Sequence, residues 1–130
     1  LPAPRLRAYP RETVVAEKFQ AMVLFGLANT RMKDYYDIWI LSRSYAFDAE
    51  RLSRAIAATF ERRGTAIPED LPDALTPAFS TDATKQRQWE AFARDLFAEV
   101  PSLEVIVADL AGFLMPHARQ ALSRARGRQP

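Results

Sequence analysis

Hydrophobic positions near the start of the chain repeat at the spacing of an amphipathic helix. From residue 11 to about residue 27 the apolar side chains share one broad arc, at Val14, Val15, Phe19, Met22, Val23 and Phe25. Pro10 suits the first position of a helix, where a missing N–H costs nothing. Glu17 and Gln20 point away from the arc, whereas Lys18 falls inside it. The pattern predicts a helix that carries a lysine among core-like side chains.

A second helix is predicted from about Met32 to Ser44, after a turn at residues 29–31. Its residues 35–41 are apolar nearly all round apart from Asp37, which is typical of a helix covered on most sides. Asp34 lies one turn earlier, and the i, i+3 spacing puts both carboxylates on one face.

Three further helices complete the pattern. Asp48 is a good N-cap for a helix at 49–63, and Ser80 or Thr81 for one that reaches about Glu99. A proline-rich connection at 65–80 separates them, and we expect it to be packed down, with single helical turns. The last long helix starts near Leu103, and Pro116 should end or kink it.

The fold expected from these elements is all-α, a bundle of about five helices with a short extended segment at its N-terminus. We assign residues 1–9 to that segment, residues 10–116 to the helical part and residues 117–130 to a basic tail.

Composition narrows the function classes. The chain has 130 residues, is 48% hydrophobic and carries a net charge of +2, so one domain with a real core is expected and nucleic acid is allowed as a partner. It contains no cysteine, which excludes disulfides, thiolate metal sites and a cysteine nucleophile. No signal peptide or membrane span is indicated, so we expect a cytoplasmic protein.

Lys18, Asp34 and Asp37 are the strongest candidates for a charged site, because charges in core-like surroundings need partners. An ammonium facing a cleft suits a phosphate group. A purely structural ion pair, with Lys18, Lys33 or Arg31 as the counter-charge of Asp37, explains the same pattern. Either alternative predicts that the Lys18 ammonium lies within ~4 Å of one carboxylate or shares a concavity with it.

Other signals for chemistry are weaker. His117 has no histidine or cysteine companion, so neither a metal site nor a serine–histidine triad is expected. The four glycines form no phosphate-binding loop. The adjacent arginines Arg62 and Arg63 are explained by a helix C-terminus. The arginines after residue 116 suit a solvated tail better than an RNA contact.

Two segments together resemble a known family. They are Tyr9 to Ala21, which contains Ala16-Glu17-Lys18, and Asn29 to Asp37, which contains Arg31-Met32-Lys33-Asp34-Tyr35-Tyr36-Asp37. They resemble the C-terminal motifs of the AbiEii/AbiGii nucleotidyltransferase-like toxins, and the stretch from Thr59 to Thr65 is similar to the segment that follows in one branch. The resemblance spans roughly residues 5–115.

The resemblance implies a bilobed protein, with an α/β nucleotidyltransferase lobe followed by this helical C-terminal lobe. It implies that Lys18, Asp34 and Asp37 are catalytic residues, that Lys18, Lys33 and Arg31 contact nucleotide phosphates, and that the metal ligands belong to the other lobe. Mg²⁺ and an NTP are the implied cofactors. RNA, such as tRNA, and an antitoxin are the implied partners, in toxin–antitoxin and abortive-infection (phage-defence) systems.

The chain departs from that family in one respect, since it has no Gly-Ser metal-binding motif. We therefore expect the 130 residues to be a C-terminal part whose missing N-terminal lobe completes the site, and to be inactive alone. The alternative is a non-catalytic helical module that binds an antitoxin or RNA. A third alternative is a structural bundle with a buried ion pair.

Overall fold

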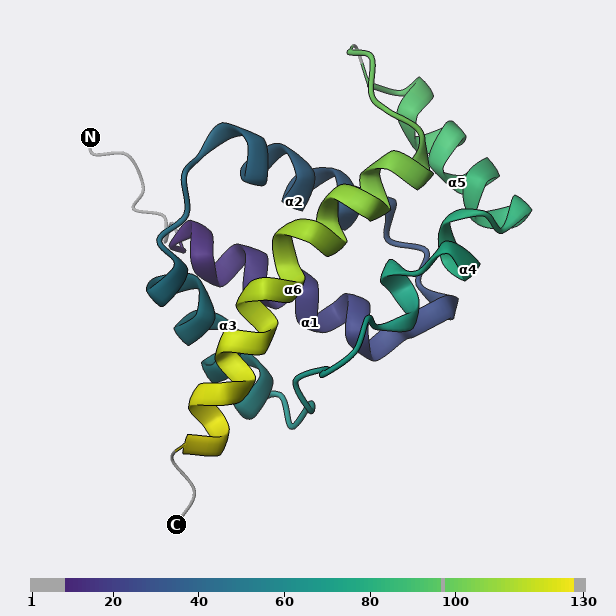
Figure 1. Ribbon diagram of the computed structural model, residues 1–130. Coiled ribbons are helices and arrows are strands. Elements are labelled where there is room, and N and C mark those ends of the chain that lie inside the picture. Colours follow the sequence, from purple (N-terminus) through teal and green to yellow (C-terminus); the bar gives the residue numbers. More distant parts are fainter. Residues whose placement is uncertain (1–8, 97, 128–130) are drawn as a thin grey trace, which may run out of the picture.

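A computed structural model describes residues 9–96 and 98–127, and its regular structure there is entirely helical (Figure 1). The α-helices are α1 (Arg11–Phe25), α2 (Met32–Ser44), α3 (Ala49–Arg62), α4 (Pro77–Ser80), α5 (Ala83–Arg94) and α6 (Leu103–Gly127), with 3₁₀ turns at Gly26–Ala28 and Asp73–Leu75. The all-α prediction is confirmed. The extended segment expected at residues 1–9 falls almost wholly outside the described residues.

The core lies where four helices meet. Helix α1 packs against α3 and α2, and α6 packs against α3 and α2, with α6 running across the bundle in Figure 1. Fully buried side chains from each helix fill this centre: Phe19, Tyr35, Phe60 and Leu110 among them. On α3, Leu52, Ile56 and Phe60 follow one another at helical spacing and are all buried. Within the described residues, no helix is both long and apolar enough to cross a membrane.

Two polar contacts fix α2 within this arrangement. The Tyr35 hydroxyl donates to the carbonyl of Ala74 at 2.8 Å, and the Trp39 indole donates to Asp109 Oδ2 at 2.9 Å. The first ties α2 to the proline-rich connection, and the second ties it to α6. These two hydrogen bonds therefore hold the helix that carries Asp34 and Asp37 from two sides.

The boundaries of α5 were predicted incorrectly. Its N-cap is Asp82, whose Oδ2 accepts the Lys85 N–H at 3.0 Å, and the helix ends at Arg94, short of Glu99. Ser80 and Thr81 end the short helix α4 instead. Ser80, Thr81 and Asp82 are neighbours of similar N-cap propensity, and the extra turn at 77–80 takes up the two predicted caps, so Asp82 begins α5.

Pro116 does not end the last helix. Helix α6 continues to Gly127, so residues 117–127, which we assigned to a basic tail, are helical. A proline inside a helix costs about 3 kcal/mol. Burial on both sides offsets that cost, since Leu114, Met115, Ala118 and Ala121 are all in the core. Packing therefore outweighs the local signal.

The arc predicted for α1 was correct at its centre and wrong at its edges. Val15, Phe19 and Met22 are fully buried. Phe25 is 44% exposed, whereas Gln20, expected to face solvent, is buried. The Gln20 amide donates to the Thr65 hydroxyl at 2.9 Å, in the loop after α3. A partner distant in the sequence thus decides which edge of the arc is covered.

Gly64 shapes that loop and gives a stability prediction. It ends α3 with φ of 61°, a left-handed conformation that costs other residues about 1 kcal/mol. Gly112 lies exposed inside α6 with open space around it, where alanine is the better helix former by up to about 1 kcal/mol. We expect Gly64→Ala to lower the melting temperature and Gly112→Ala to raise it, measured by thermal denaturation. Melting-temperature shifts of the same sign in the two variants would mean that the backbone conformation of Gly64 does not decide the effect.

Candidate functional site

Lys18 reaches from α1 to α2 and meets both predicted carboxylates. Its Nζ lies 3.0 Å from Asp34 Oδ1 and 3.1 Å from Asp37 Oδ2. The side chain remains 23% exposed. The distance predicted from the sequence is therefore confirmed, for both aspartates at once. Two carboxylates sharing one ammonium is a charge-assisted arrangement that holds a flexible lysine stem in one place.

The turn before α2 positions these carboxylates. The side chain of buried Asn29 accepts the Arg31 N–H at 2.9 Å, and α2 begins directly afterwards. Asp34 lies in the first helical turn, where the helix dipole favours a carboxylate. Its side chain is 6% exposed and also lies 2.9 Å from Arg31 Nε. The sequence prediction of a turn at residues 29–31 is confirmed, and this turn brings Arg31 to Asp34.

Asp37 lies one helical turn further along and is more open. Its side chain is 21% exposed, and Oδ2 also accepts from Lys33 Nζ at 2.6 Å. Lys33 itself is mostly exposed. The cluster therefore combines three cations with two carboxylates, and Asp37 is the more exposed of the two carboxylates.

Burial and ion pairing act in opposite directions on the pKa of Lys18. Partial burial lowers it, but the hydrogen bonds to Asp34 and Asp37, with their negative charges, outweigh burial and raise the pKa above its ordinary value of 10.5. The group is therefore an ammonium at neutral pH. It can neutralise an anion, but it is not available as a nucleophile or as a base.

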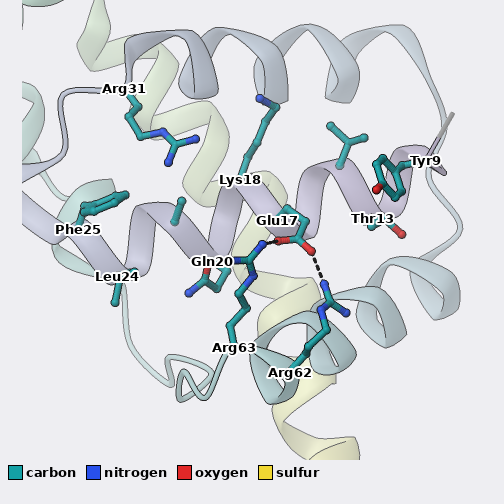
Figure 2. A pocket seen from close by; sticks show the side chains of 12 residues that line it. Tyr9, Thr13, Glu17, Lys18, Gln20, Leu24, Phe25, Arg31, Arg62 and Arg63 are labelled. Atoms are coloured by element: carbon teal, nitrogen blue, oxygen red, sulfur yellow. Dashed lines mark hydrogen bonds and ion pairs between the residues drawn. The ribbon is translucent and has the colours of Figure 1, made fainter. Parts of the chain in front are cut away.

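A concavity of about 800 Å³ opens beside the cluster. The exposed face of α1 forms its floor, as Figure 2 shows, and Lys18 points from this helix toward α2. Arg31, from the turn before α2, lines the same side. Lys33, Asp34 and Asp37 do not line the concavity. The structure thus brings Lys18 and Arg31 together at the opening, while Lys33 lies outside it.

The opposite side of the concavity comes from the end of α3 (Figure 2). Glu17 forms an ion pair with Arg62 and another, at 2.9 Å, with Arg63. Sequence reasoning assigned these arginines to the helix C-terminus and missed this contact. The sequence carried no signal for this contact, because Glu17 was expected to face solvent, where a carboxylate needs no ion-pair partner.

Comparison with protein-family models shows which family the chain belongs to. Residues 1–124 match the model of the nucleotidyl transferase AbiEii toxin family of type IV toxin–antitoxin systems. The chain belongs to the AbiEii family. Comparisons with curated proteins and with solved structures gave no match. Membership makes this a toxin-type chain related to nucleotidyltransferases, from a kind of system in which an antitoxin is the partner.

The described residues do not fit a metal ion of their own. No three His, Asp or Glu side chains come together in the part of the AbiEii chain that the structure describes. Asp34 and Asp37 are both bound by Lys18. We therefore assign no step to a metal held by these residues.

Proposed function

We propose that this chain is the C-terminal part of a nucleotidyltransferase-like toxin that transfers a nucleotide from an NTP to RNA, with tRNA as a candidate acceptor. An N-terminal lobe would complete the site and hold Mg²⁺. Family membership supports the reaction class. The observation that carries the proposal is the Lys18 ammonium, held by two carboxylates and still exposed beside a large concavity.

Lys18 would bind the triphosphate as a cation. Nucleotidyl transfer forms a bond from the acceptor hydroxyl to the α-phosphorus and breaks the bond to pyrophosphate, so negative charge builds up on the departing group. A positioned ammonium stabilises that charge without reorganising during the reaction. Its raised pKa keeps it charged through neutral pH.

The two aspartates would differ in role. Asp34 is nearly buried between Lys18 and Arg31, so it acts as a positioning residue that holds both cations. Asp37 is more exposed and would orient the lysine or accept the proton of the acceptor hydroxyl. Arg31, which lines the concavity, adds a second phosphate contact, and the exposed Lys33 would reach phosphate only from outside it.

A transfer assay tests the proposal. The parent protein, meaning the product of the whole reading frame that encodes this chain, is incubated with Mg²⁺, one labelled NTP at a time and total cellular RNA. We expect label in RNA of tRNA size with at least one NTP, and none with the 130-residue chain alone. Absence of labelled RNA with every NTP would reject nucleotidyl transfer and leave a non-catalytic helical module.

A further inference from the structure

Lys18 and Arg31 form one cationic wall of the concavity. Arg62 and Arg63 form a second cationic wall on its opposite side. Within residues 9–96 and 98–127, Glu17 is the one carboxylate within 4.0 Å of either guanidinium. Two positive charges therefore face one negative charge, and both arginine side chains are more than half exposed. A guanidinium has five N–H donors, so donors remain on each arginine after pairing with Glu17. The surplus charge and donors favour an additional anion here.

This wall is held in place from two sides. Glu17 binds both guanidinium groups from α1. The loop that follows the arginines is fixed by Gly64, in its left-handed conformation, and by the hydrogen bond from Gln20 to Thr65. The end of α3 and the loop after it are thus joined to the middle of α1 by three side-chain contacts. Preorganised donors lose less entropy when they bind a ligand.

The two cationic walls stand on opposite sides of the exposed face of α1. Glu17 and Lys18 are consecutive, so their side chains diverge by about 100° around the helix, one toward α3 and the other toward α2 (Figure 2). A helix with its side chains is about 10–12 Å wide. The phosphates of an NTP are joined through single oxygen atoms and cluster at one place. A polynucleotide carries one phosphate per nucleotide along its length and can meet both walls.

Exposed aromatic side chains lie at the two ends of the concavity, Phe25 at the end near Arg31 and Tyr9 at the other (Figure 2). Tyr9 and Phe25 both line the concavity and are exposed, and the Arg31 guanidinium lies 5.8 Å from the centre of the Phe25 ring. Aromatic side chains beside a basic groove are typical of single-stranded nucleic-acid sites, where bases stack on the rings. We propose that Arg62 and Arg63 bind the phosphodiester backbone of the single-stranded end of the RNA acceptor.

An RNA-binding assay tests this inference. A short fluorescein-labelled single-stranded RNA is titrated with the 130-residue chain, and binding is measured by fluorescence anisotropy over about 50 to 200 mM salt. We expect Arg62→Gln and Arg63→Gln each to weaken binding about three- to tenfold and to reduce the salt slope by about 0.7. Glu17→Gln keeps an oxygen acceptor for the arginines but removes the negative charge that repels phosphate, and should strengthen binding severalfold. A purely structural ion pair predicts no such gain.

Matched controls come from another exposed ion pair, Arg126 with Glu69. Arg126→Gln and Glu69→Gln change the net charge equally but lie outside the concavity, so neither should alter binding. Equal effects at both pairs, or no binding by the unaltered chain at low salt, would overturn the inference.

Competition with an NTP in the same assay distinguishes a site for the RNA backbone from a site for the triphosphate of an NTP. RNA binding that persists in excess NTP supports a separate RNA site, and complete displacement of RNA would overturn it. The inference rests on the proposed function, but its readout is RNA binding without transfer. Labelled RNA in the transfer assay together with unchanged binding by the Arg62 and Arg63 variants would reject the inference alone.

Discussion

Lys18→Ala in the parent protein is expected to lower nucleotidyl transfer by about a hundredfold or more, and to abolish toxicity. The loss of one preorganised charge aimed at developing negative charge typically costs a factor of about 10²–10³ in rate. In this chain no neighbour replaces it, because Arg31 already makes its own proposed phosphate contact and Lys33 lies outside the concavity. The measurement is the rate of label transfer to RNA.

The same substitution should change stability little. Asp34 keeps its contact with Arg31 at 2.9 Å, and Asp37 keeps Lys33 at 2.6 Å, so neither carboxylate is left without a cation. Removing one partner of a buried pair costs about 3–5 kcal/mol only when the remaining charge is uncompensated. We expect a loss of about 1 kcal/mol, which is a few degrees of melting temperature in a chain of this length.

Two variants control this experiment. Lys18→Arg keeps the charge and should retain part of the activity, while Arg54→Ala removes a cation from the exposed pair with Glu50, outside the concavity, and should retain all of it. A large fall in melting temperature with transfer intact would show that Lys18 is a structural ion-pair residue, and the proposed role would be wrong.

The features predicted correctly from the sequence are those decided locally. The N-cap at Asp48, with its side chain accepting the Arg51 N–H at 3.1 Å, depends on residues within one turn. One contact between two helices was predicted as well, the approach of Lys18 to Asp34 and Asp37. Charges inside apolar arcs need partners, and the two predicted helices offered few charged residues at such positions.

The features that were missed depend on partners distant in the sequence. Gln20 is buried where it bonds to the loop after α3, and Phe25, at the end of α1, is exposed and lines the concavity. The pairing of Glu17 with Arg62 and Arg63 spans about 45 residues. Helical periodicity gives the direction of a side chain but not the element it meets, so the second wall of the concavity could not be predicted.

The contact between α1 and α3 gives the largest expected loss of stability. Phe60 is fully buried, and its ring centre lies 5.4 Å from that of Phe19. Truncation of a buried phenylalanine to alanine costs about 3–5 kcal/mol, because apolar contacts are lost and a cavity remains. That is a large share of the roughly 5–15 kcal/mol by which domains are stable. We expect Phe60→Ala to lower the melting temperature by about 10–25 °C.

Phe25→Ala is the matched control, because the same side-chain atoms are removed from a position that the helical arc predicted to be buried and the structure leaves exposed. We expect its free energy of unfolding to change by less than about 0.5 kcal/mol. Equal losses for the two variants, measured by urea denaturation, would mean that Phe25 is covered in solution, and the aromatic end of the concavity would then not be open to RNA. A large loss at Phe60 alone would show that the aromatic core holds α3 on α1, so that the position of Arg62 and Arg63 beside the concavity does not depend on Phe25.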